Sequence, residues 1–342
     1  MALSRILVIQ TAFIGDVVLA TALVEKLSAA YPEAEIDMLV RKGNEGLLQG
    51  HPRLHTVLVW NKQQKKYRHL REIWKLVRAR RYDLVVNLQR FAATGFVTAF
   101  SGAKETVGFD KNPWSFAFTR RVAHTVSTPD APLHEVQRNQ ALIAHLAGDQ
   151  PGKPRLYPRP ADEEQVQSLK QEPYVCIAPA SVWFTKQFPA EQWVSLVRAL
   201  PPSLRVYLIG GPADHALCER IREAVWKESQ AAGQASPGME NLCGKLGFLA
   251  SAALQRDARM NYVNDSAPMH FASAVNGPVT AIYCSTLPSF GFGPLSDRSW
   301  IVESKEALRC RPCGLHGHRQ CPEGHFHCAK TIRTEQLLEP LA

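Results

Sequence analysis

The feature that most constrains this chain is a strand, a glycine turn and a helix at its very start. Residues 6–10 form a short apolar run rich in β-branched side chains, which predicts a buried strand. A turn containing Gly15 and Asp16 follows, and the apolar residues 17–27 predict a helix. This order opens a doubly wound α/β domain, in which ligands bind at the carboxyl ends of the strands.

Asp16 has two interpretations at this point. A carboxylate at a helix start is favoured by the helix dipole and can cap the first N–H groups. The same carboxylate, facing a bound ligand, can act as a general base. The turn alone does not decide between these roles.

The length of 342 residues, of which 45% are apolar, favours two domains that each bury a core. No apolar stretch approaches the roughly 20 residues that a membrane helix needs. The chain runs almost at once into its first strand, so we expect no signal peptide and a cytoplasmic location. The net charge of +9 favours anionic partners: phosphates, acidic sugars, acidic membranes or nucleic acid.

Strand and helix patterns alternate through the N-terminal half and again through the C-terminal half, which predicts mostly parallel sheets. A proline-rich stretch at residues 149–160 separates the two series and is typical of a linker. We therefore expect an N-terminal Rossmann-like domain at 1–155 and a C-terminal one at 156–342. The clearest strand patterns lie at 35–40, 57–60, 84–88, 174–179, 206–209, 261–264 and 279–283.

A basic segment lies between the third and fourth predicted strands. Its apolar residues recur at three-to-four spacing, so it is expected to be a helix with one apolar face. Glu72 is its single acid, against nine cations: Lys62, Lys65, Lys66, Arg68, Arg71, Lys75, Arg78, Arg80 and Arg81. The segment is either a solvated face or a patch for an anionic acceptor or lipid, which adds on the order of 1 kcal/mol per basic residue near a charged membrane.

Further candidates for contacts with an anionic acceptor lie later in the first half. His134 and Arg138 are four residues apart at the start of a predicted helix, so they share a face. The complete set of candidates is Lys65, Lys66, Arg68, Arg120, His134 and Arg138.

In the second half, a polar or glycine-rich loop follows each predicted strand. Parallel strands bring such loops to one edge of the sheet, where glycines and helix N-termini favour a phosphate. Each loop alone is a weak signal, but together they predict a site for a nucleotide diphosphate. The candidate residues are Ser181, Lys186, Gly210, Gly211, Asp214, Asp265, Ser266 and His270.

Two of these segments match a known family. Residues 9–18 resemble the N-terminal signature of the bacterial ADP-heptose:lipopolysaccharide heptosyltransferases of glycosyltransferase family 9, and residues 264–270 resemble their second signature. Lys186 with its Phe-Pro neighbours resembles the lysine loop of that family. Phe184 and Thr185 depart from it, because more polar residues are common there.

The resemblance implies a GT-B fold, with two Rossmann-like domains facing each other across a cleft, and an inverting mechanism that uses no metal and no cofactor. The acceptor, a lipid A-core glycolipid, would bind the N-terminal domain during peripheral contact with the cytoplasmic face of the inner membrane. ADP-heptose would bind the C-terminal domain. Asp16 would take the proton from the acceptor hydroxyl, and Lys186 would stabilise the diphosphate leaving group.

Two other functions stay open. One is a GT-B glycosyltransferase that uses another nucleotide sugar, and the other is a non-catalytic nucleic-acid-binding protein, although we expect no nucleic-acid partner. The last stretch of the chain keeps its own alternatives. Its four cysteines are spaced either for a tetrahedral zinc site or as reduced thiols in a compact loop: Cys310, Cys313, Cys321 and Cys328.

Overall fold

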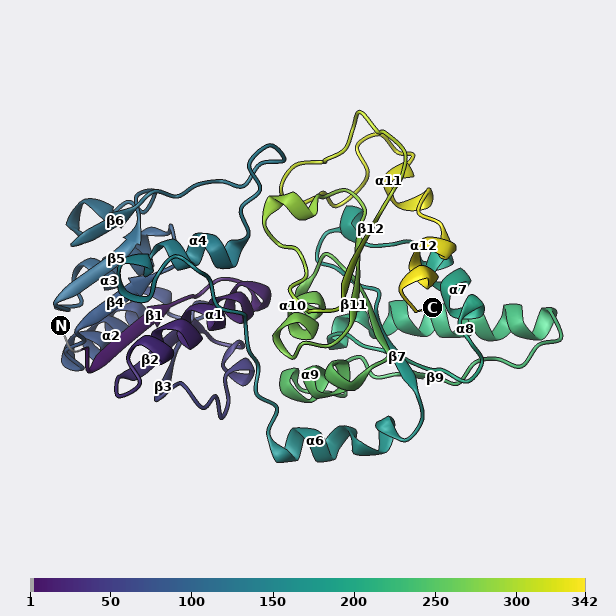
Figure 1. The fold of residues 1–342 in the computed structure, drawn as a ribbon, viewed down its shortest axis with the longest axis horizontal. Coiled ribbons are helices and arrows are strands. Elements are labelled where there is room, and N and C mark those ends of the chain that lie inside the picture. Colours follow the sequence, from purple (N-terminus) through teal and green to yellow (C-terminus); the bar gives the residue numbers. More distant parts are fainter. Residues whose placement is uncertain (1–2, 342) are drawn as a thin grey trace. The chain divides into compact units, whose positions relative to one another are not determined.

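The computed structural model describes residues 3–341 and divides the chain into two compact units, one ending at Tyr157 and the other beginning at Pro158. The expected division fell after residue 155, inside the proline-rich stretch. Each unit consists of one parallel sheet with helices on both of its faces (Figure 1).

The first unit contains a six-stranded sheet in the order β3-β2-β1-β4-β5-β6, with every neighbouring pair parallel. Its four central strands are almost entirely buried, which explains their continuous apolar runs. The strands are β1 (Arg5–Ile9), β2 (Glu35–Arg41), β3 (Thr56–Trp60), β4 (Leu84–Asn87), β5 (Glu105–Phe109) and β6 (Arg120–Val122).

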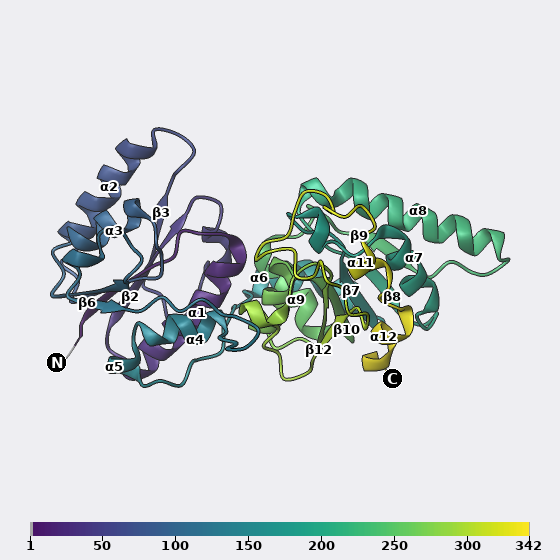
Figure 2. The ribbon, with the colours of Figure 1, turned by 90° about the horizontal axis from the view of Figure 1, so that it is seen from above.

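Helices cover both faces of this sheet. On one face α1 packs against α4 and α5, and on the other α2 packs against α3 (Figure 2). The amphipathic pattern of the basic segment is realised in α2, whose Ile73 and Val77 are buried against the sheet. The bounds are α1 (Ile14–Ala30), α2 (Lys66–Ala79), α3 (Ala92–Ala99), α4 (Glu135–Ala141) and α5 (Ala144–Ala147).

The second unit contains a six-stranded sheet in the order β12-β11-β10-β7-β8-β9, again with every neighbouring pair parallel. Two apolar cores lie on its two faces, one built with α7, α8 and the C-terminal helices and the other with α6, α9 and α10. The strands are β7 (Tyr174–Ala178), β8 (Arg205–Leu208), β9 (Met239–Asn241), β10 (Met260–Asn264), β11 (Val279–Tyr283) and β12 (Ser299–Glu303). The helices are α6 (Pro160–Gln167), α7 (Ala190–Ala199), α8 (His215–Ala231), α9 (Phe248–Asp257), α10 (Ala267–Ala274), α11 (His327–Lys330) and α12 (Thr334–Leu338).

The strand orders place a switch point in each sheet, where the direction of chain progression reverses. It lies between β1 and β4 in the first unit and between β7 and β10 in the second. Loops leaving adjacent strands at such a point diverge and open a crevice at the carboxyl edge, where ligands bind in folds of this type. The loops that carry Asp16, Lys186 and Asp265 all leave strands at these two points.

The predicted α/β class with doubly wound parallel sheets is confirmed. The predicted strands did not include β6, β9 and β12, which are edge strands without a fully buried run. Within residues 3–341 no helix has the length and apolarity that crossing a bilayer requires.

Candidate active site

Asp16 stands at the carboxyl edge of the first sheet, in the first turn of α1. One of its carboxylate oxygens, Oδ2, accepts a hydrogen bond of 3.1 Å from the backbone N–H of Phe13, which immediately precedes the helix. The capping role expected for this carboxylate is therefore present. This cap does not prevent Asp16 from acting as a base, because a carboxylate has about four lone-pair sites and the cap occupies one of them.

The surroundings of Asp16 raise its affinity for a proton above that of an aspartate in water. Burial, and then the negative charge of Glu135 at the start of α4, raise the pKa of Asp16 to about 6. The hydrogen bond from Phe13 and the charge of Arg41 oppose this shift. A carboxylate with a pKa near 6 is ionised at neutral pH, yet it is more basic than an ordinary aspartate, which suits general-base catalysis.

Two cations beside this edge were not among the predicted acceptor residues. The Arg41 guanidinium lies over the Phe13 ring, 5.0 Å from its centroid. Lys62 Nζ donates to the backbone oxygen of Thr11 at 2.8 Å, and burial, together with Arg41 and Lys66, lowers the pKa of Lys62 to about 8. Arg41 is the last residue of β2 and Lys62 lies two residues beyond β3, so both stand at the carboxyl edge of the sheet. Lys62 was one of the nine cations of the basic segment, whereas no sequence pattern indicated Arg41.

The predicted acceptor residues do not all meet at this edge. Lys65 and Lys66 stand at the start of α2, which begins beyond the carboxyl end of β3, and Arg68 pairs with Glu72 at 3.0 Å. Arg120 starts β6 and pairs with Glu105 at the opposite, amino-terminal end of β5.

The predicted helix near His134 is confirmed as α4. Its two candidate acceptor residues, His134 and Arg138, make contacts within the protein that stabilise this region. The His134 Nδ1 atom accepts from the N–H of Val136 and caps α4. Arg138 is buried, pairs with Glu135 and donates to the backbone oxygen of Thr125. The group on α4 that acts on Asp16 is therefore Glu135, which the sequence analysis did not select.

Lys186 and Asp265 are brought together at the switch point of the second sheet. Lys186 ends the short 3₁₀ turn after β7, Asp265 follows β10, and Nζ lies 2.6 Å from Oδ2. The hydroxyl of Thr286, in the loop after β11, donates to the same oxygen at 2.8 Å. The loops after three neighbouring strands of the sheet, β7, β10 and β11, thus contribute one partly buried polar cluster. An ammonium group with three donors can hold both Asp265 and an incoming phosphate oxygen.

Asn264 ties the two main loops of this edge together. Its Nδ2 donates to the backbone oxygen of Pro179 at 2.8 Å, and its Oδ1 accepts from the N–H of Phe188 at 3.0 Å. The side chain therefore brackets the loop that carries Lys186. The sequence motif contained Asn264, but its role as a loop clamp depends on residues far away in the chain.

The other predicted donor residues occupy the same edge with different roles. Ser266 and His270 begin and line α10, and the backbone oxygen of Ser181 accepts from Gln187 at 2.6 Å. Gly210 and Gly211 follow β8, where a Cβ on Gly210 would come within 2.7 Å of Asp214. The Gly211 N–H donates to Asp214 at 2.8 Å, so this amide is directed at a carboxylate rather than presented to a phosphate.

The cysteines of the last stretch do not form a metal centre in this structure. Among residues 3–341 no group of three or more His, Cys, Asp or Glu side chains is arranged to hold a metal ion. Cys310 Sγ lies 3.9 Å from His325 Nε2, which is a hydrogen-bond distance for sulfur and longer than a shared metal site would need. Burial raises the pKa of Cys328 to about 12, which keeps this thiol protonated at neutral pH.

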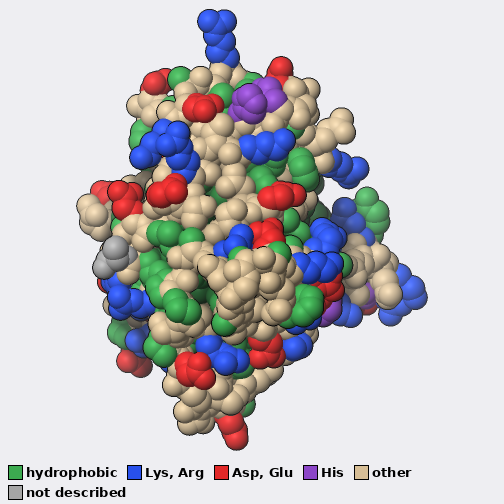
Figure 3. Space-filling model, turned by 90° about the vertical axis from the view of Figure 1, so that its right-hand side faces the viewer, with side chains coloured by type: hydrophobic (Ala, Val, Ile, Leu, Met, Phe, Trp, Pro, Cys, Tyr) green, Lys and Arg blue, Asp and Glu red, His purple; other side chains and the backbone are tan. Residues whose placement is uncertain are grey.

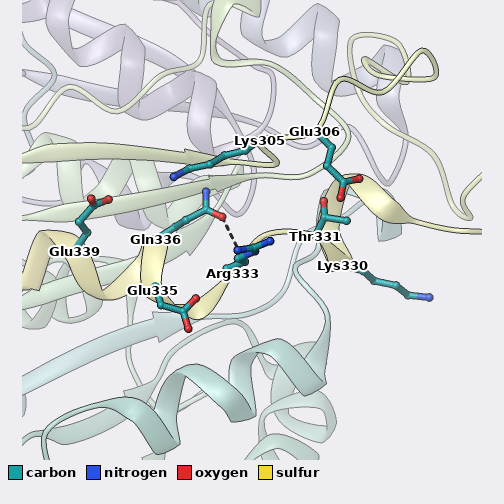
Figure 4. Close-up of a pocket in the computed structure, with 8 residues that line it drawn as sticks. All are labelled: Lys305, Glu306, Lys330, Thr331, Arg333, Glu335, Gln336 and Glu339. Atoms are coloured by element: carbon teal, nitrogen blue, oxygen red, sulfur yellow. Dashed lines mark hydrogen bonds between the residues drawn. The ribbon is translucent and has the colours of Figure 1, made fainter.

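A pocket of about 700 Å³ lies away from all the predicted site residues, beside α11 and α12 (Figure 4). Its charged side chains have both signs, and one wall is closed by a hydrogen bond from the Arg333 N–H to Gln336 Oε1 at 2.9 Å. The face drawn in Figure 3 likewise has basic and acidic side chains interspersed. Neither surface offers the one-signed charge that an anionic polymer would need.

Comparison with known proteins decides the family. The model of "Glycosyltransferase family 9 (heptosyltransferase)" matches residues 70–327, which is most of the chain. The chain belongs to this family. Its Lys186–Asp265 cluster lies within the matched residues, whereas Asp16 precedes them.

Several heptosyltransferases are similar to this chain over 80% or more of its length. Lipopolysaccharide heptosyltransferase 3 of Escherichia coli is 27% identical over 80% of this chain and 82% of its own. Lipooligosaccharide heptosyltransferase 2 of Haemophilus influenzae is 26% identical over 98% of both chains. The solved ADP-heptose LPS heptosyltransferase II of E. coli superposes with a TM-score of 0.78 at 24% identity, covering 98% of this chain and 97% of its own, which confirms the GT-B class of fold.

Proposed function

We propose that this glycosyltransferase moves heptose from ADP-heptose to the inner core of lipopolysaccharide with inversion at the anomeric carbon. The observation that carries the proposal is the paired arrangement at the two switch points. A carboxylate with a pKa of about 6 stands at one, and a lysine held by a buried carboxylate stands at the other. A base and a cation for a leaving phosphate are the two groups that such a transfer requires.

In the proposed reaction Asp16 accepts the proton of an acceptor hydroxyl. The hydroxyl oxygen forms a bond to the anomeric carbon of the donor sugar from the face opposite the diphosphate. The bond from that carbon to the diphosphate oxygen breaks, and ADP leaves with the electron pair. Lys186 offsets the negative charge that grows on the leaving oxygen, and this stabilisation is greatest in the transition state.

The choice of ADP-heptose as the proposed donor is based on the similar proteins. The matched heptosyltransferases act in lipopolysaccharide or lipooligosaccharide synthesis by their names, and the E. coli structure is named for ADP-heptose. Ser181, Asp265, Ser266 and His270 would hold the nucleotide sugar. Gly210, Gly211 and Asp214 would shape the neighbouring loop, with Asp214 facing Gly211 rather than phosphate.

The acceptor would be a lipid A-core glycolipid, met at the cytoplasmic face of the inner membrane. Basic α2 supports this part of the proposal, because its cations outnumber its acid. A chain of aromatic rings extends from it: Trp74, Phe96, Phe100, Trp114 and Phe116, with successive centroids 5.0–6.0 Å apart. Phe116 is 72% exposed. Exposed aromatic rings beside cations are typical of surfaces that contact an anionic bilayer.

The proposal is tested by incubating the purified chain with ADP-heptose and core acceptors of increasing length, followed by mass spectrometry. We expect one acceptor to gain the mass of a heptose unit and other nucleotide sugars to give little product. A better turnover with another nucleotide sugar would favour a different GT-B transferase. No turnover with any donor, combined with tight and salt-sensitive RNA or DNA binding, would favour the nucleic-acid-binding alternative.

A further inference from the structure

The loop that carries Lys186 is held by a segment more than a hundred residues away. Thr185, the residue before the lysine, is buried, and its N–H donates to the backbone oxygen of His318 at 3.1 Å. The N–H of His318 donates in return to the Thr185 hydroxyl at 2.7 Å, and the Ser285 hydroxyl reaches the same oxygen at 3.0 Å. Thr185 is thus fixed by the C-terminal stretch and by the loop after β11.

The same C-terminal stretch fixes the loop after β11. Arg311 is largely buried and its guanidinium donates to the backbone oxygens of Cys284, at 2.7 Å, and Thr286, at 2.9 Å, while it pairs with Glu303 on β12. The N–H of Cys313 donates to the Ser285 oxygen at 2.9 Å. Thr286 is the residue whose hydroxyl reaches Asp265, so Arg311 acts on the donor cluster through this loop.

Gly317 lies directly against the loop that carries Lys186. A Cβ at this position would lie 2.8 Å from Thr185 Oγ1, 3.1 Å from Lys186 Cγ and 3.2 Å from Ser285 Oγ. Backbone and two buried hydroxyls meet here without room for a methyl group. The 3₁₀ turn Phe184–Lys186 is only three residues long and has few hydrogen bonds of its own, so its position depends on these outside contacts.

We infer that Arg311, Gly317 and the backbone of His318 position the Lys186–Asp265–Thr286 cluster, with Arg311 and Gly317 as positioning residues. The inference rests on the proposed sugar transfer, in which Lys186 must lie where charge develops on the diphosphate. A lysine has four rotatable carbon–carbon links, so precision has to come from its backbone and from Asp265. Electrostatic stabilisation by a preorganised site is lost steeply when the charged group is displaced.

The chain contains its own matched control. Gly314 and Gly317 have nearly the same left-handed backbone, with φ of +71° and +75°, so alanine is similarly strained at both. A Cβ on Gly314 has nothing within 4 Å. The difference between Gly317→Ala and Gly314→Ala therefore isolates contact with the lysine loop from backbone strain.

The experiment measures kcat, the donor KM and the Kd for ADP of both variants, with thermal unfolding as a check on folding. We expect Gly317→Ala to lower kcat at least tenfold and to weaken ADP binding several-fold, while Gly314→Ala stays within about twofold of wild type. Equal effects of the two substitutions on kcat and on ADP binding would overturn the positioning role.

Thr185→Val serves if Gly317→Ala does not fold. It removes the hydroxyl that joins His318 and Ser285 with little change of volume, and should lower kcat and ADP affinity in the same way. A Thr185→Val enzyme that is merely less heat-stable, with unchanged kcat and ADP affinity, would overturn the inference. If the wild-type chain neither binds ADP nor transfers heptose, the proposed function and this inference both fail. If the wild type is active and the variants have unchanged kcat and ADP affinity, only the inference fails.

Discussion

Asp16 and Lys186 occupy equivalent places in the two units, each after the strand beside a switch point, but they are held in different ways. Asp16 accepts from the N–H of its own helix start and is otherwise influenced by charges at a distance, those of Glu135 and Arg41. Lys186 is in direct contact with Asp265, and its loop is hydrogen-bonded to residues from three other parts of the chain. The surroundings of Asp16 therefore determine its proton affinity, whereas those of Lys186 determine where its ammonium group lies.

This contrast fits the two tasks. A general base must gain and lose a proton in each cycle, so its pKa matters more than a rigid network around it. A cation that stabilises a leaving diphosphate keeps its charge throughout, so its contribution depends on where it is fixed. Loss of the base is therefore expected to affect kcat alone, and loss of the cation to affect both kcat and binding of the donor.

The largest effect is expected for Asp16→Asn, which keeps the size and the capping of the side chain but removes the base. General-base catalysis contributes typically 10²–10⁴-fold, so kcat should fall by about that factor. Calorimetric titration should give an ADP affinity close to that of wild type. Near-normal turnover would leave Asp16 with its capping role only.

A second, somewhat smaller effect is expected for Lys186→Ala. Removing one charged donor from a developing anion costs about 10²–10³ in kcat, and the donor KM should rise as well. Lys245→Ala is the control, because Lys245 is 54% exposed and pairs with Glu240 on the surface of the same unit. Unchanged donor kinetics in Lys186→Ala would show that the diphosphate is stabilised elsewhere.

Neutralising Lys65, Lys66, Arg68 and Arg71 together tests the surface of α2. The acceptor KM should rise several-fold and binding to anionic vesicles should weaken, more so at low salt, because the Debye length is about 8 Å at physiological ionic strength. Donor KM should stay constant.

The control neutralises an equal number of surface cations of the second unit: Arg198, Arg205, Arg222 and Lys245. It changes the net charge equally, so a similar loss in both variants would mean that total charge, and not α2, governs the encounter with the acceptor.

The smallest effect is expected for Arg120→Gln. Its partner Glu105 lies at the amino-terminal end of β5, away from the edge that carries Asp16, and exposed ion pairs contribute about 0.2–1 kcal/mol. Acceptor KM should stay within about twofold of wild type. A rise comparable to that of the α2 variant would place the acceptor across a much larger surface.

Sequence patterns were sufficient to predict features that depend on residues close together in the chain. The buried run of β1, the turn at Gly15 and the helix behind it are determined by neighbouring residues, as is the helix that starts beside His134. The residues that act at a distance were not accessible in this way. Glu135 affects Asp16 only because α4 packs on α1, and Thr185 meets His318 across 133 positions of the chain.

The departure at Thr185 from the family pattern also receives a physical account. A threonine before the lysine turns inward and joins the C-terminal stretch and the loop after β11 through one hydroxyl. The sequence could thus nominate Asp16, Lys186 and Asp265 as candidates, whereas the contacts that orient them required the fold.

The most direct test of the account is the dependence of kcat/KM on pH for the wild type and for Asp16→Asn. A base that must be ionised, with a pKa of about 6 in the free enzyme, predicts that wild-type kcat/KM rises about tenfold per pH unit below 6 and becomes level above it. The residual activity of Asp16→Asn should lack this rising limb. An identical limb in both enzymes would contradict the assignment of Asp16 as the base.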